Sequence, residues 1–67
     1  MSTVDTKLQA LINAAGANAT EEQSDEVVNF ITTNYPKEDW AWASLQAINV
    51  GSVYTDISER LGECGMF

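Results

Sequence analysis

Apolar residues in the first part of the chain recur at the three- and four-residue spacing of one helix face. They are Val4, Leu8, Leu11, Ile12 and Ala15. Ser2 and Thr3 are residue types that commonly cap a helix start, and Gly16 stands where a left-handed residue often ends one. We therefore predict a helix over residues about 3–15, followed by a short connector.

A second helix is predicted over residues about 21–34, because Thr20 and Gln23 have the spacing of a capping box. On a helical wheel the large apolar residues of this segment fall on one side. They are Val27, Val28, Phe30, Ile31 and Tyr35. The acids of the first turns fall on the other side, and they are Glu21, Glu22, Asp25 and Glu26. The pattern predicts one buried face and one acidic surface face.

The next segment begins at Pro36, a residue that suits the first turn of a helix because the amide hydrogen it lacks has no partner there. The alternation Trp40-Ala41-Trp42 would also fit a strand, but Leu45 and Ile48 continue the helical spacing. We therefore predict a third helix over residues about 36–49.

Gly51 ends the third helix, and Ser52 can cap a fourth over residues about 52–63. One apolar stripe follows this segment, with Tyr54 at its edge. Its members are Val53, Ile57, Leu61 and Cys64.

The periodicity as a whole predicts an all-α fold, a compact bundle of four short helices in one domain over residues 1–67. The predicted core consists of Leu8, Leu11, Ile12, Val27, Val28, Ile31, Trp40, Leu45, Ile48, Val53, Ile57 and Leu61. Short connections make neighbouring helices pack against each other. Because a chain of this length buries a small core, a homodimer or a bound partner would add to its stability.

Charge narrows the classes of partner. Ten acidic residues, three basic residues and no histidine give a net charge of −7, which repels nucleic-acid phosphates and anionic lipid headgroups. No stretch approaches the roughly 18 apolar residues of a membrane span, and the start of the chain lacks the order of a signal peptide. We expect a cytoplasmic protein that does not act at membranes and whose partner is not nucleic acid.

Few residues in the sequence have side chains suited to catalysis or metal binding. Cys64 is the only cysteine, and without histidine it lacks the companions of ordinary zinc and catalytic-cysteine sites. Glu22 and Glu26 lie one helical turn apart and could approach a metal ion, but such a pair is far more often a solvated face. We therefore expect no enzymatic activity, no metal and no other cofactor.

One short pattern spans the third and fourth predicted helices. Ala47, Gly51 and Ile57 have the spacing of a small residue, a turn glycine and an inward apolar residue, which resembles the core of a helix-turn-helix. In that resemblance the second helix would read DNA, yet it carries Asp56 and Glu59 against a single Arg60. The resemblance implies a corner between two helices more than a DNA reader.

Trp42 is a large apolar residue that the helical wheel places away from the predicted core. It falls with Gln46 and Asn49 on the polar side of the third helix, whereas Trp40 falls on the core side. Two interpretations stay open: the C-terminal Met66-Phe67 covers Trp42, or Trp42 contacts a second chain, since tryptophan is enriched at interface centres.

These observations favour a non-enzymatic interaction module, an adaptor or inhibitor that binds a basic surface of a larger protein. Mimicry of nucleic acid by the acidic face is one form that such binding could take. The predicted partner-binding residues are Glu21, Glu22, Asp25, Glu26 and Trp42. The acidic face also has a simpler interpretation, which is solubility. Two alternatives are a small helix-turn-helix regulator that binds DNA as a dimer through the third and fourth helices, and a structural subunit of a larger assembly.

Overall fold

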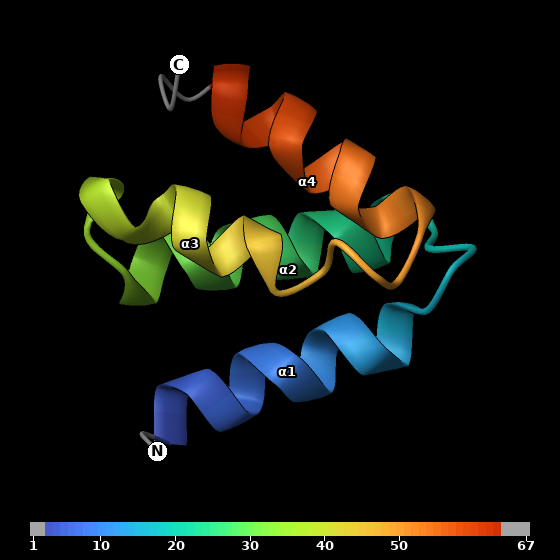
Figure 1. The fold of residues 1–67 in the computed structure, drawn as a ribbon, viewed down its shortest axis with the longest axis horizontal. Helices are drawn as coiled ribbons and strands as arrows, with labels where there is room; N and C mark the ends of the chain where they lie inside the picture. The colour runs from blue at the N-terminus through green and yellow to red at the C-terminus, as the bar shows by residue number, and fades with distance from the viewer. Residues whose placement is uncertain (1–2, 64–67) are drawn as a thin grey trace.

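Four α-helices and one 3-10 turn make up the part of the chain that the computed structural model describes, residues 3–63 (Figure 1). The elements are α1 (Thr3–Ala15), α2 (Glu21–Asn34), η1 (Lys37–Asp39), α3 (Trp40–Leu45) and α4 (Ser52–Glu63). The predicted all-α bundle of four short helices is confirmed. Cys64, Met66 and Phe67, which the sequence analysis singled out, lie outside the described residues.

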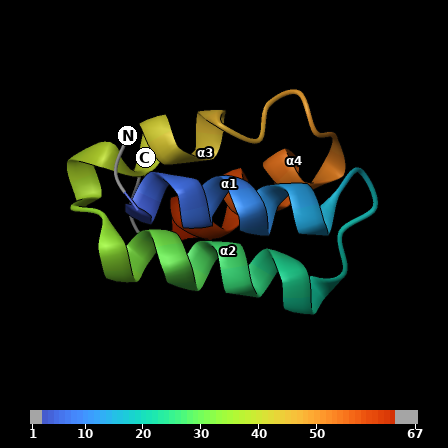
Figure 2. The ribbon, with the colours of Figure 1, turned by 90° about the horizontal axis from the view of Figure 1, so that it is seen from below.

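The helices pack in a chain of neighbours. α1 packs mainly on α2, α2 also contacts α4, and α4 contacts α3. Seen from below, α3 and α2 lie at opposite edges of the molecule, with α1 and α4 between them (Figure 2). α1 and α3 therefore approach each other without packing closely along their length.

The first two helices begin and end as predicted. Gly16 has a φ of +66° and its amide donates to the Ile12 carbonyl at 3.1 Å, which is the left-handed end expected for α1. At the start of α2 the Gln23 amide donates to the Thr20 hydroxyl at 3.2 Å, and the Thr20 amide donates to the Gln23 side chain at 3.0 Å. The predicted capping box is confirmed.

The third helix is shorter than predicted. Tyr35 is extended because a residue before proline is disfavoured in helical geometry, and Pro36 is extended as well, so the helical segment starts at Lys37 and not at residue 36. At the other end, α3 stops at Leu45, and hydrogen bonds between residues three apart replace the helical ones as far as Val50. The predicted span 36–49 is thus a 3-10 turn, a short α-helix and a tight coil.

Most of the predicted core is confirmed. The buried apolar residues are Leu8, Ile12, Ala15, Val27, Val28, Ile31, Ala43, Ala47, Val53, Ile57 and Leu61. Leu11 and Trp40 are only partly buried and pack against this cluster. The prediction is wrong for Leu45 and Ile48, which are 47% and 52% exposed.

The buried face of the third segment consists of small residues. Ala43 and Ala47 are fully buried, and Ser44 is buried with its hydroxyl donating to the Ala41 carbonyl at 2.8 Å. Small side chains let a helix approach its neighbours closely, so this segment lies tight against α4 with its alanines inward. The larger Leu45 and Ile48 are consequently left at the surface.

The loop before α4 is docked on the loop after α1. Gly51 has a φ of +113°, and a Cβ at that position would lie 3.2 Å from the Ala17 Cβ. The Ser52 amide donates to the Ala17 carbonyl at 3.3 Å, and the Ser52 hydroxyl donates to the same oxygen. Ser52, predicted as a helix cap, is the first residue of α4 and ties its start to the other loop.

Candidate protein-binding surfaces

The four acidic residues predicted to bind a partner lie on the outer side of α2. Glu21, Glu22, Asp25 and Glu26 are all exposed, whereas Val27 and Val28 are buried, as the helical wheel predicts. The acidic face is therefore real as a surface feature. At its end, Glu26 lines a shallow depression together with Leu11 and Phe30.

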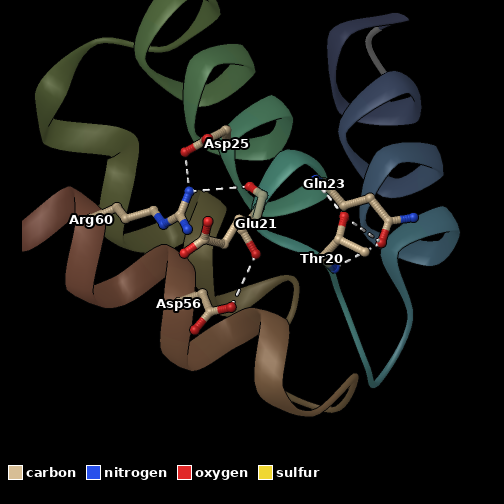
Figure 3. A network of polar contacts seen from close by, with 7 residues as sticks. Thr20, Glu21, Gln23, Asp25, Asp56 and Arg60 are labelled. Atoms are coloured by element: carbon tan, nitrogen blue, oxygen red, sulfur yellow. Dashed lines mark hydrogen bonds and ion pairs between the residues drawn. The ribbon is translucent and has the colours of Figure 1, made fainter.

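Part of this acidic face also holds the fold together. Arg60 reaches from α4 to form an ion pair with the Asp25 carboxylate, and its guanidinium donates to the Glu21 carbonyl at 3.3 Å (Figure 3). Beside it, the buried Ser24 hydroxyl donates to the Asp56 carboxylate at 3.1 Å. Asp25 and Asp56 thus join α2 to α4, and Asp25 is less available to a partner than its exposure suggests.

Trp42 lies at the surface of α3, with 47% of its area exposed. Its ring contacts the Tyr35 ring, with the centroids 6.1 Å apart, and its backbone carbonyl accepts a hydrogen bond from the Gln46 side chain at 3.0 Å. One edge of the indole is therefore held against the domain. The rest of the ring faces outward.

Two further large apolar side chains continue from Trp42 along the surface. Leu45 and Ile48 follow at three-residue intervals, and both are about half exposed. The amides of Gln46, Ala47 and Ile48 bond to carbonyls three residues back, and side chains three apart nearly eclipse in such geometry. Leu45 and Ile48 are therefore nearly in line, and Trp42 and Leu45, three residues apart in α3, share one helix face. Trp42, Leu45 and Ile48 are here called the apolar stripe.

A groove separates α1 from α3 beside this stripe. It has a volume of about 550 Å³. Its walls are formed by Asp5, Thr6, Leu8, Gln9, Ala10, Asn13, Trp42 and Gln46. Asp5 is the only charged residue among them. Trp42 belongs both to the apolar stripe and to this α1–α3 groove.

One end of the groove is fixed by Tyr35. Its hydroxyl donates to the Asp5 carboxylate at 2.6 Å, and the Trp40 indole nitrogen donates to the Tyr35 carbonyl at 3.0 Å. Burial, the hydrogen bond to Asp5, and the charges of Asp5 and Asp39 raise the pKa of Tyr35 to about 12. The Tyr35 ring that supports Trp42 is thereby anchored to both α1 and α3.

The acidic face and Trp42 are separate surfaces. The acids lie in the first half of α2, whereas Trp42 contacts Tyr35, which follows the end of that helix. Glu26 and Tyr35 are nine residues apart, which corresponds to roughly 13 Å along a helix axis. Of the five predicted partner-binding residues, Trp42 therefore lies with α1 side chains and not with the four acids.

The remaining sequence predictions concern metals, membranes and DNA. No group of three or more potential metal-binding side chains occurs within residues 3–63, and no helix in that range is long and apolar enough to cross a membrane. Of the helix-turn-helix pattern, Ala47 and Ile57 are fully buried, and Gly51, with a positive φ, lies in the segment that joins α3 to α4. No family model matches the chain, and neither does any curated protein or solved structure.

Proposed function

We propose that this protein is a non-enzymatic interaction module, an adaptor or inhibitor that binds a larger protein with a basic surface through the apolar stripe. One observation carries the proposal: Trp42, Leu45 and Ile48 are 47%, 47% and 52% exposed side by side on one short segment. Single exposed apolar residues are ordinary, but contiguous ones mark interaction sites. Within the stripe, Leu45 and Ile48 are also the residues of the third segment whose exposure departs from the predicted core.

The stripe has enough remaining apolar surface to matter for binding. Full burial of a large apolar side chain contributes about 1.5–3 kcal/mol relative to full exposure, so half-exposed residues retain roughly half of that each. Tryptophan is moreover among the residues that most often dominate interface energies. Three such residues in a row can therefore form the centre of a small interface.

The charge of the chain supports a basic partner. A net charge of −7 attracts a positive surface over distances of about one Debye length and raises the rate of encounter. Exposed acids such as Glu22 and Glu26 lie outside the stripe, so they contribute to steering and orientation. Apolar contact and charge thus have different roles in the proposed complex.

A site-specific crosslinking experiment tests this proposal. A photoreactive phenylalanine derivative replaces Leu45 in the stripe in one variant, and Glu22 on the acidic face in a matched variant. Each variant is irradiated in lysate of the native host, and the crosslinked proteins are identified by mass spectrometry. Each identified protein is then purified, and its affinity for the unmodified chain is measured over a salt series. The proposal predicts that a basic protein crosslinks to position 45 and that its affinity for the chain falls as the salt concentration rises. Crosslinks to position 22 alone would show that the stripe is not the binding surface.

A second candidate function uses the corner between α3 and α4. The buried Ala47 and Ile57 and the turn at Gly51 favour a helix-turn-helix regulator that binds DNA as a dimer. Against it, α4 exposes Glu59 and Glu63, and Arg60 is already paired with Asp25. A gel shift at low salt decides between the two functions, because any DNA-binding domain retains non-specific affinity under that condition.

The third alternative is a structural subunit of a larger assembly. Light scattering of that assembly would then show a fixed number of copies of this chain.

A further inference from the structure

Tyr35 lies between the core and the exposed Trp42. Three aromatic rings follow one another here: the Phe30 and Tyr35 centroids are 6.4 Å apart at an interplanar angle of 65°, and the Tyr35 and Trp42 centroids are 6.1 Å apart at 50°. Phe30 and Tyr35 are partly buried and pack against the core. Aromatic pairs at such distances and tilted angles attract each other beyond the effect of their buried area. The Trp42 indole is therefore connected to the core through the Tyr35 ring.

The Tyr35 side chain is held at both of its ends. At the backbone end, the Tyr35 amide donates to the Ile31 carbonyl at 3.0 Å, and the Tyr35 carbonyl accepts a hydrogen bond from the Trp40 indole at 3.0 Å. At the far end, the hydroxyl donates to the Asp5 carboxylate at 2.6 Å. A ring that is fixed at its tip as well as at its backbone cannot swing aside, so it gives its neighbour a rigid support.

Such a support matters because Trp42 is only about half buried. The indole is 47% exposed, and exposed side chains change rotamer within picoseconds to nanoseconds unless a neighbour restrains them. A partner that binds a mobile indole must order it, which lowers the affinity by about two- to tenfold for one side chain. An indole that is already held in its binding orientation avoids this loss.

We infer that Tyr35 is a positioning residue of the proposed binding surface: its ring holds the Trp42 indole in one orientation before a partner arrives. This inference rests on the proposed function and deepens it, because it states how the surface is prepared for binding. On the sequence alone, Tyr35 belongs only to the buried face of the second helix. Its effect on binding is exerted through Trp42 and requires no contact between Tyr35 and the partner.

Nitrogen-15 relaxation of the two indole N–H groups tests this positioning without any partner. In the unmodified chain we expect both Trp42 and Trp40 to have order parameters of about 0.85, the value of a rigid N–H group. In Tyr35→Leu the Trp42 value should fall below about 0.6, which indicates a flexible group. Trp40 should change little, because its indole bonds to the backbone carbonyl of residue 35. A general loosening of the fold would move both indoles.

Two further variants complete the comparison. Tyr35→Phe keeps the ring and should leave the Trp42 order parameter near that of the unmodified chain. Tyr54→Leu is the matched control, because Tyr54 is also a partly buried tyrosine packed against the core but lies in α4. This control should leave Trp42 unchanged. A mobile Trp42 indole in the unmodified chain, or equal mobility in Tyr35→Leu and Tyr54→Leu, would overturn the inference.

Binding kinetics then connect the orientation of the indole to function. The probe is the basic protein that crosslinks to position 45, and its association and dissociation rates are measured with each variant. Because fewer molecules hold the indole in the binding orientation, Tyr35→Leu should lower the association rate by about two- to tenfold and leave the dissociation rate nearly unchanged. Faster dissociation alone would mean that Tyr35 contacts the partner directly, which would overturn the inference.

The inference and the proposed function fail in different ways. If Tyr35→Leu frees the Trp42 indole and the crosslinked protein still binds this variant as fast as the unmodified chain, the inference fails while the proposed function stands. If no basic protein crosslinks to position 45, the proposed function fails, and the relaxation data alone still show whether Tyr35 orients Trp42.

Discussion

The Tyr35 hydroxyl donates to the Asp5 carboxylate at 2.6 Å, and this contact joins the end of α2 to the start of α1. The two residues are thirty positions apart, so no local pattern links them. The same ring supports Trp42. A structural hydrogen bond and a candidate binding residue are therefore coupled through one aromatic side chain.

Removal of the Tyr35 hydroxyl should lower stability. Tyr35→Phe keeps the ring contacts but removes the hydroxyl that donates to Asp5, and a hydrogen bond to a charged group contributes about 1.5–3 kcal/mol, less where solvent reaches it. We expect the free energy of unfolding in urea to fall by about 1 kcal/mol. Tyr54→Phe is the control, because that hydroxyl takes no part in the contact. Equal losses of unfolding free energy in the two variants would show that the hydrogen bond to Asp5 does not stabilise the fold.

The same contact predicts a pH dependence. The pKa of Tyr35 is raised from 10.0 to about 12, so the folded state retains a proton that the unfolded state loses first. The contribution of Tyr35 to stability is therefore fully present below pH 10 and disappears as the pH rises towards 12. The difference in unfolding free energy between the unmodified chain and Tyr35→Phe should shrink over that interval. A difference that grows with pH would contradict the shift.

The glycine that turns the chain into α4 should tolerate substitution poorly. Gly51→Ala combines a positive φ with a Cβ only 3.2 Å from the Ala17 Cβ, whereas Gly16→Ala has a positive φ and open space around it. We expect a loss of about 1 kcal/mol for Gly16→Ala and about 2–3 kcal/mol for Gly51→Ala. Thermal unfolding of both variants shows which substitution causes the larger loss of stability. A smaller loss at Gly51 would mean that the two loops are not docked as described.

The packing of the third segment gives a prediction opposite to that of the core expected from the sequence. Ala47→Leu forces extra volume into a fully buried position and should cost about 1–3 kcal/mol. Leu45→Ala removes a half-exposed side chain and should cost less than about 1 kcal/mol. Urea unfolding of both variants distinguishes the arrangements, since a core role for Leu45 would make its truncation the more damaging change.

The parts of the fold that the sequence predicts well are those decided locally. Thr20 and Gln23 satisfy each other's backbone, and Gly16 supplies a left-handed residue, so the bounds of α1 and α2 follow from short-range chemistry. The acidic face of α2 follows from the same periodicity. These features need no knowledge of what packs against the helix.

The stripe and the groove depend on tertiary packing instead. The predicted core ranks Leu45 and Ile48 above Ala43 and Ala47 for burial, because it weighs side-chain size and not the closeness of a neighbouring helix. Here the tight approach of α4 reverses that order. The α1 wall of the groove could not be predicted either, since apart from Leu8 it consists of polar residues and Ala10, which line a groove with Trp42 only once the bundle forms.

The central claim is that the apolar stripe binds a partner protein. Its most direct test is the affinity of the purified crosslinked protein for the double variant Leu45→Ser/Ile48→Ser, with Glu22→Gln as the control and circular dichroism as the check that all chains fold. We predict that the double variant binds at least about tenfold more weakly while the control changes little at physiological salt. Equal affinity of the double variant and the unmodified chain would contradict the claim.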